Sequence, residues 1–283
     1  MSIELVKKYA PKVDELFAAE SKISLLTNSD YDWTGAHAVK IYKVSTAEMN
    51  DYQRNVYADD PESAAALSRF GELYDLSAST EECLLKKDRS FIFNVDLLDT
   101  DETGGAVEAE SALARQIRNV VIPEVDTYVY TAMAAAAGTK PAAAALTVAN
   151  IYENILAGSE VLDDNEAPET DRAIVVCPAV YKLLKQAAVF DHCDIGAELR
   201  VLGVVGMIDG MNVIKVPSAR LPENFGFMVC HPSATCAPVK LEDYGIHSDT
   251  VLSSGSIVTG RVCYDAFVLD NKVKGIYYQA MSE

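Results

Sequence analysis

The stretch DRSFIFNVD, residues 88–96, and the run that follows it from residue 107 to residue 138 decide the fold of this chain. In the first stretch, Phe91, Phe93 and Val95 fall at every second position, and the polar Ser90, Asn94 and Asp96 lie on the opposite alternation, which is the period of a half-buried strand. A turn is expected at residues 100–105 (TDETGG), because paired glycines tolerate positive φ and acidic residues suit the amino end of a helix. The two stretches therefore predict a strand that leads into a helix.

The predicted helix is long and one-sided. Its apolar residues recur at steps of three or four, and they are Leu113, Ile117, Val121, Val125, Tyr128, Ala132 and Ala136. At 1.5 Å per residue the run would extend roughly 45–50 Å, which is longer than most globular helices. Pro123 lies inside the pattern and has no N–H group, so we expect a kink or an interruption near residues 120–123.

These segments, in this order, resemble the major capsid proteins of tailed bacteriophages, the family with the HK97-like shell fold. The matching stretches are the strand at 91–96, the helix core at 115–128 (RQIRNVVIPEVDTY) and residues 172–184 (RAIVVCPAVYKLL), and nearly the whole chain can be laid on the family plan. The resemblance implies an α+β fold. Its expected parts are an N-terminal arm (1–34), an extended β-ribbon loop (35–104), a peripheral domain on the long spine helix (105–139 and 250–283) and an axial domain (140–249).

The rest of the chain also predicts the α+β class, since strands and helices do not alternate regularly. Residues 173–177 (AIVVC) form a continuous apolar run, typical of a strand buried on both faces. Helices are expected at 147–162 and 179–188, and short strands at 203–216, 226–229 and within 256–280. Strands at 39–44 and within 76–98 predict a two-stranded ribbon, which is only marginally stable alone and needs a partner surface.

Composition excludes some classes of protein. The chain has 283 residues and is 49% hydrophobic, yet no stretch approaches the roughly 20 apolar residues that span a bilayer. Its N-terminus lacks the pattern of a secretory signal, and its six cysteines are irregularly spaced, so we expect cytoplasmic synthesis and free thiols. The net charge of −18, without clustered Lys and Arg, argues against sequence-specific nucleic-acid binding. The acidity favours solubility, and the resemblance implies an acidic inner wall that repels packaged DNA.

No motif indicates catalysis, a cofactor or a metal. Residues 203–210 (GVVGMIDG) have neither the dinucleotide-binding nor the P-loop spacing and are interpreted as strand turns. The pairs Cys230-His231 and His192-Cys193 lack the two-knuckle spacing of zinc sites. Some members of the resembled family form Lys–Asn cross-links, but no residue pattern here identifies the geometry of that reaction.

The resemblance implies a structural protein, not an enzyme, that self-assembles through pentameric and hexameric capsomers into an icosahedral shell. The shell would enclose phage double-stranded DNA without sequence-specific binding, in a virion capsid assembled in the bacterial host cytoplasm. Portal and scaffolding proteins are the further partners implied, with no cofactor and no membrane. The alternatives are an encapsulin-like nanocompartment shell of the same fold and, from a different class, an intracellular α+β enzyme.

Two regions are expected to contact other subunits. Residues 86–89 are one of the few positive patches, and residues 1–34 carry an apolar stripe at helical spacing that can cross to a neighbour or pack on its own subunit. In the first case, deleting residues 1–34 leaves a folded subunit that assembles poorly. The candidate contact residues are Lys86, Lys87, Asp88, Arg89, Phe17 and Trp33.

Overall fold

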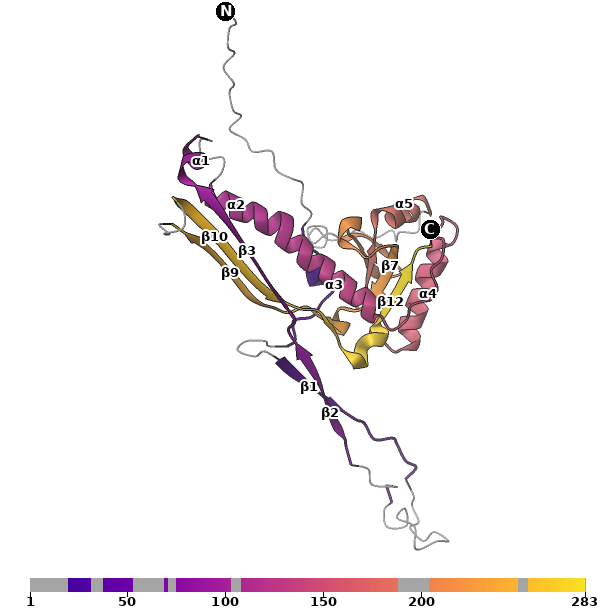
Figure 1. Ribbon diagram of the computed structural model, residues 1–283. Helices are drawn as coiled ribbons and strands as arrows, with labels where there is room; N and C mark the ends of the chain where they lie inside the picture. The colour runs from indigo at the N-terminus through magenta and orange to yellow at the C-terminus, as the bar shows by residue number, and fades with distance from the viewer. Residues whose placement is uncertain are drawn as a thin grey trace, which may run out of the picture. The chain divides into compact units, whose positions relative to one another are not determined.

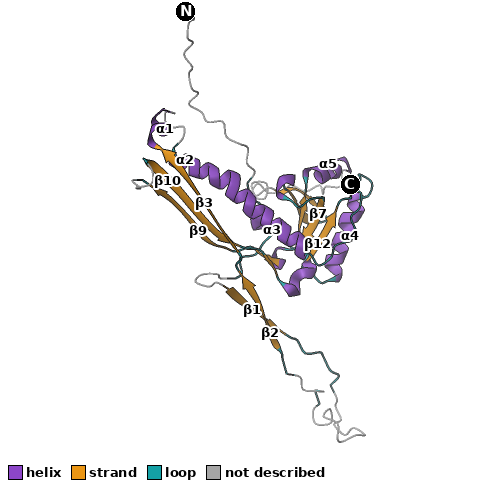
Figure 2. Cartoon of the chain, viewed as in Figure 1, coloured by secondary structure: helices purple, strands orange, loops and turns teal. Residues whose placement is uncertain are grey.

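The computed structural model describes residues 20–31, 38–52, 69–70, 75–102, 108–187, 204–248 and 254–282. Helices and strands are mixed along the chain without regular alternation, which confirms the α+β class (Figure 2). The chain divides into two compact units, one made of Met1–Thr34 with Leu85–Glu283 and the other of Gly35–Leu84. Each unit is described by itself.

The unit Gly35–Leu84 contains the predicted two-stranded ribbon. Strands β1 (Ala38–Val44) and β2 (Ala78–Leu84) pair antiparallel, from Ala38 opposite Leu84 to Val44 opposite Ala78. An ion pair of 2.9 Å between Lys43 and Glu81 joins the two strands on one face. The ribbon ends earlier than the expected residue 104, because the next strand, β3, pairs with a different sheet.

A three-stranded antiparallel sheet in the other unit contains the alternating stretch from which the fold was predicted. Its order is β3 (Lys87–Asp96), β10 (Gly255–Tyr264) and β9 (Val239–His247), with β10 in the centre. The alternation is confirmed, since Phe91 and Phe93 are half-buried whereas Ile92 between them is exposed. The Phe91 ring lies over Gly260, where an added Cβ would come within 2.3 Å of it. Gly260 therefore makes room for the aromatic ring across the strands.

The long helix runs along this sheet (Figure 1). A short helix, α1 (Leu97–Glu102), takes the first part of the expected turn, and Gly104 and Gly105 lie outside the described residues. Then follow α2 (Ala109–Gln116), a π-helical turn (Ile117–Val121) and α3 (Ile122–Ala136). In the π turn the N–H of Ile122 donates to the carbonyl of Ile117, five residues back. The predicted interruption beside Pro123 is thus confirmed and takes the form of a π turn.

The π turn also corrects the predicted apolar stripe. A π turn holds one more residue than an α turn, so it rotates the buried face of everything that follows. The buried residues of α3 are Asp126, Val129, Tyr130, Met133 and Ala134. Ala132 and Ala136, which continued the predicted stripe, are only partly buried.

A five-stranded sheet forms the second part of the same unit, in the order β12 (Ile276–Ala280), β7 (Phe225–Cys230), β4 (Ala173–Val176), β6 (Met211–Lys215) and β5 (Val204–Ile208). The expectation for β4 is confirmed, since all four of its residues are buried between a parallel neighbour and an antiparallel one. A two-residue turn joins β5 to β6, with Asp209 at φ 50° and Gly210 at φ 72°. Positive φ at both positions is typical of a tight hairpin.

Two helices complete the core around this sheet. Helix α4 (Ile151–Asp164) packs on β7, β12 and α5 (Pro178–Ala187), and it buries Ile151, Ile155 and Leu162. Gly158 allows the close approach, because an added Cβ would stand 3.1 Å from the Tyr277 ring. Short elements join these parts, namely the 3-10 turns at Ile23–Leu25, Ser218–Arg220, Pro232–Ala234 and Asp270–Gly275 and the strands β8 (Thr235–Cys236) and β11 (Phe267–Val268).

Strand pairing departs from the expected domain boundaries in two places. Strand β9 falls in the expected axial segment 140–249 but pairs with β10, and β12 falls in the expected peripheral segment 250–283 but pairs with β7. In the described part of the chain, the backbone thus passes between the two sheets three times: after β3, between β7 and β9, and between β10 and β12. Local sequence does not specify which strand accepts these hydrogen bonds, because any strand offers the same backbone groups.

Candidate assembly surfaces

The predicted patch at residues 86–89 is exposed, and each of its residues contacts its own chain. The Lys86 backbone N–H donates to Asp265 Oδ2 over 2.8 Å, and Lys87 Nζ lies 5.1 Å from the centre of the Tyr128 ring. Two ion pairs follow along the strand. Asp88 accepts two hydrogen bonds from Arg261, of 2.6 and 2.9 Å, and Arg89 donates to Glu124 over 2.7 Å.

These contacts hold the start of β3 in place. The two hydrogen bonds from Arg261 lower the pKa of Asp88 below its ordinary value, since they favour the carboxylate. Behind the patch, Asp265 is almost fully buried and accepts hydrogen bonds from the Tyr128 hydroxyl and from the Lys86 backbone. Burial is the larger cause and the hydrogen bond to Asp265 the second of a rise in the pKa of Tyr128 to about 12. The structure therefore presents the lysines of the patch on a rigid strand end.

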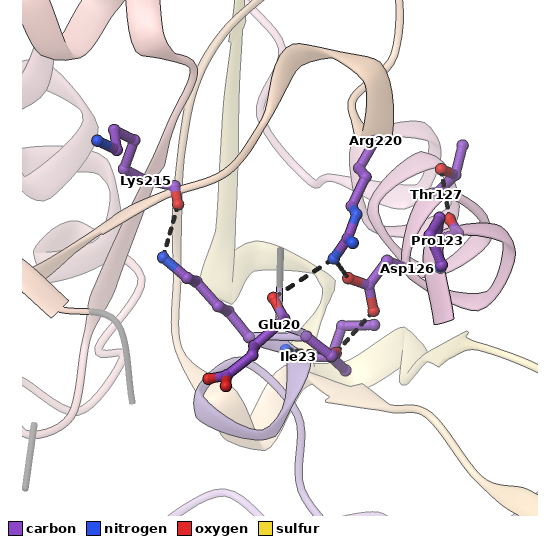
Figure 3. Close-up of polar contacts among 9 residues, drawn as sticks. Glu20, Ile23, Pro123, Asp126, Thr127, Lys215 and Arg220 are labelled. Carbon is purple, nitrogen blue, oxygen red and sulfur yellow. Dashed lines mark hydrogen bonds and ion pairs between the residues drawn. The ribbon is translucent and has the colours of Figure 1, made fainter. Parts of the chain in front are cut away.

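A buried polar network that the sequence analysis did not identify lies at the end of the expected arm (Figure 3). Arg220, from the turn before β7, forms a 2.7 Å ion pair with Asp126 of α3, and both side chains are almost fully buried. The Ser21 hydroxyl donates to the other oxygen of Asp126 over 2.7 Å, and Arg220 donates to the Glu20 carbonyl over 3.4 Å. Burial raises the pKa of Asp126, against the opposing effects of Ser21 and Arg220.

One signal in the sequence could have revealed this network. Asp126 follows Val125 inside the apolar part of the long helix, and a carboxylate that is buried at such a position requires a partner. The partner is 94 positions away in the sequence, so the residue pattern alone could not name Arg220.

Residues 20–28 pack on their own subunit, which corrects this part of the expected arm of residues 1–34. Leu26 has 0% exposure and packs in the main hydrophobic cluster. Asn28 donates through its backbone to Thr235 over 2.9 Å and through its side chain to the Ser233 carbonyl over 2.9 Å. These contacts hold residues 20–28 against the subunit. Phe17 and Trp33, the other two candidate residues, lie outside the described residues.

The ribbon carries large apolar side chains in solvent. Tyr42 and Val44 on β1 are 75% and 61% exposed, and Leu76 just before β2 is 63% exposed. Soluble proteins rarely leave such a concentration of apolar surface without a partner. The ribbon is therefore a candidate interface.

The residues considered for metal binding have other roles in the structure. Cys230 is fully buried in β7, and burial raises the pKa of its thiol to about 12. The Nδ1 atom of His231 lies 2.7 Å from the Ser233 hydroxyl. His192 and Cys193 fall outside the described ranges, and within those ranges no three metal-binding side chains gather. No helix in the described part of the chain is long and apolar enough to cross a membrane.

Known proteins similar to this chain are found by comparing structures and not by comparing sequences. No family model matches the chain, and no curated protein matches it by sequence. Among solved structures, a chain of Mycobacterium phage Che8 is similar with a TM-score of 0.73 and 17% identity, over 97% of this chain and 96% of that one. A chain of the mature capsid of bacteriophage PhiM1 gives a TM-score of 0.71 and 14% identity, over 98% and 92% of the two chains.

A chain of the capsid of cyanophage P-SCSP1u is similar over the same share of this chain. Its TM-score is 0.69 and its identity 16%, with 98% of this chain and 93% of that one covered. Because the similarity covers each pair of aligned chains almost from end to end, the two chains of a pair share the whole fold and not a single domain. The chain therefore has the fold of phage capsid subunits, in agreement with the HK97-like fold expected from its sequence.

Proposed function

We propose that this chain is a major capsid protein whose activity is self-assembly, through pentameric and hexameric capsomers, into an icosahedral shell around phage double-stranded DNA. The observation that carries the proposal is the end-to-end similarity to capsid subunits. Shell proteins bind copies of themselves, so their working surfaces are interfaces, and the proposed role is structural and not enzymatic.

The ribbon supports the proposal because it has the properties of an interface element. Two strands alone are marginally stable in water, and Tyr42 and Val44 project from the same face of β1 into solvent. Burying an apolar side chain of this size contributes about 1.5–3 kcal/mol. Packing against a second copy would stabilise the ribbon and the contact together.

The patch at residues 86–89 is proposed as a second contact with a neighbouring subunit. Asp88 and Arg89 already have partners of opposite charge in their own chain, which leaves Lys86 and Lys87 as the lysines that can attract a neighbour. The chain has 42 acidic residues against 24 basic ones, so every copy offers acidic surface. Each exposed pair is worth only about 0–1 kcal/mol, but attraction between unlike patches speeds encounter at low salt.

The net charge of −18 supports enclosure of DNA without binding to it. An acidic wall repels phosphates, so packaged DNA stays free of the shell. The proposal extends to portal and scaffolding proteins as partners, and to assembly in the cytoplasm of a bacterial host.

The test is negative-stain electron microscopy and light scattering of the purified chain, without added metal or nucleotide. Shells or capsomer rings are expected, and a strict monomer at every salt and protein concentration would contradict the proposal. The double variant Tyr42→Ser with Val44→Ser should abolish assembly and leave the circular dichroism of the subunit near that of the parent. Lys40→Gln, on the same exposed face of the same strand, is the matched control and should assemble normally.

The contents of native particles separate the proposal from its alternatives. Nuclease-protected double-stranded DNA inside the particles supports the capsid, whereas enclosed protein cargo supports an encapsulin-like shell. A small monodisperse species that turns over a substrate would support the enzyme.

A further inference from the structure

A trough beside the long helix is large enough to hold a small molecule. Its volume is about 360 Å³, which lies within the range of ligand pockets in proteins, roughly 300–1,000 Å³. Much of its described lining is apolar and includes Ile117, Val121, Val125 and Val129 of the helix and Val239 and Val262 of the strands β9 and β10. Val239 is 45% exposed, so the trough opens to solvent. Walls of this kind accept an aliphatic chain.

The charged part of the lining is acidic. It contains the three carboxylates of Asp126, Glu242 and Asp265, and among the described lining residues there is no lysine, arginine or histidine. Asp126 forms an ion pair of 2.7 Å with Arg220, which balances its charge (Figure 3). No ion pair with a described residue balances Glu242 or Asp265. The trough therefore carries an excess of negative charge.

The Asp265 carboxylate is fixed in place by neutral donors. The residue is only 3% exposed. Its Oδ1 atom accepts hydrogen bonds from the Tyr128 hydroxyl over 2.7 Å and from the Ala266 N–H over 2.8 Å, and Oδ2 accepts one from the Lys86 N–H over 2.8 Å. Neutral donors orient a carboxylate without adding positive charge, so its charge acts on the trough.

Glu242 lies at the solvent side of the same lining. The residue is exposed, and its charge reaches the aromatic part of the wall. Burial, and after it the Glu242 charge, raise the pKa of Tyr244, which also lines the trough. A cation that enters from solvent therefore meets Glu242, with the buried Asp265 carboxylate in the same lining.

We propose that the trough binds a small aliphatic amine in its protonated form, with the chain on the apolar wall and the ammonium group at Glu242 and Asp265. A wholly apolar ligand would cover these two carboxylates and give them no cation, which is costly. An anion would be repelled by the same charges. An ammonium group supplies a positive charge and three hydrogen-bond donors. The inference concerns a single subunit and does not depend on the proposed shell.

The experiment is photolabelling of the full chain with three probes that share one diazirine-bearing aliphatic chain and end in an amine, an alcohol or a carboxylic acid. At neutral pH these probes are a cation, a neutral molecule and an anion. Mass spectrometry of the digested protein locates the adducts. Saturable amine adducts in the segments 117–129 or 237–244 are expected, with competition by excess hexylamine, weaker labelling by the alcohol and the weakest by the acid. Equal labelling by amine and acid, adducts elsewhere, or no saturable adducts would overturn the proposal.

Two matched variants test the role of charge. Glu242→Gln removes one charge at an exposed position and keeps the size of the side chain. It should raise the amine concentration for half-saturation about twofold to fivefold, the effect of one partly exposed ion pair, and leave alcohol labelling unchanged. Asp243→Asn is the control, because Asp243 is the next residue of β9 and its side chain projects to the opposite face of the sheet. Equal amine affinities for the Glu242 variant and the parent, or equal losses in the two variants, would contradict the proposed site.

A lysine side chain of a second copy has the same chemistry as the free amine, and protein concentration distinguishes the two. With the amine probe in excess, a labelled fraction that stays constant as protein concentration rises supports a free amine as the ligand. A fraction that falls would show that a neighbouring copy fills the trough, and the proposal would then be wrong.

Discussion

Replacing Leu26 by alanine tests whether the end of the expected arm is part of the subunit core. Leu26 is fully buried in the main hydrophobic cluster, 0% exposed, in a segment that the sequence assigned to an assembly arm. A buried Leu→Ala change removes transfer free energy and leaves a cavity, at a cost of about 3 kcal/mol. Subunits are typically stable by only ~5–15 kcal/mol, so this loss is large and easily measured.

Urea denaturation of unassembled subunits, followed by far-ultraviolet circular dichroism, measures the free energy of unfolding. Leu97→Ala is the control, because Leu97 is 66% exposed and surface changes usually stay within about 0.5 kcal/mol. Equal unfolding midpoints for the Leu26 and Leu97 variants would refute the reasoning. They would support the original interpretation, in which residues 20–31 are part of an arm that does not stabilise the subunit. A deletion of residues 1–19 should keep the fold, whereas a deletion of residues 1–28 should lose it.

Three further results are expected. Arg220→Met should lower the free energy of unfolding by about 3–5 kcal/mol, because it leaves the buried Asp126 carboxylate without its cation. Adding Asp126→Leu should restore most of the lost stability in the same urea assay. No recovery in the double variant would contradict the pairing. Burial, with the nearby Glu124 carboxylate, raises the pKa of Tyr264 to about 12. The unfolded phenol ionises near pH 10, so this residue's contribution is intact below about pH 10 and declines up to about pH 12. Urea midpoints of Tyr264→Phe should therefore fall less steeply over that window, and equal slopes would count against the shift. Finally, Lys86→Glu with Lys87→Glu should slow assembly most at low salt in light scattering, with the melting temperature of the subunit nearly unchanged; parental rates at every salt concentration would show that the patch faces solvent.

The elements that were predictable from sequence are those whose signal is local. The alternation around Phe91 and Phe93 and the apolar run at β4 follow from backbone periodicity, which a single segment displays without its neighbours. Pro123 likewise predicted an interruption, because its missing N–H removes a hydrogen bond within the same helix and needs no distant partner. The candidate patch at residues 86–89 could be found from charge alone, but its ion pairs with Glu124 and Arg261 could not.

Tertiary structure decided what depends on partners far along the chain. Whether β9 and β12 join one sheet or the other depends on hydrogen bonds that any strand can make, so the local sequence leaves this choice open. The π turn changed which side chains of α3 are buried, because one extra residue in a turn rotates the rest of the helix.

By itself, the sequence determined the class of the fold, the long helix, the ribbon and the buried strand of the five-stranded sheet, because each is encoded in the spacing of its own residues. Only the tertiary structure decided that residues 20–28 pack on their own subunit, with Leu26 in its core. Leu26 alone is fully buried in this segment, and its neighbours are held in place because Asp126, Arg220 and Thr235 supply hydrogen-bond partners. A side chain is buried or exposed according to what lies opposite it, and that partner comes from another part of the chain.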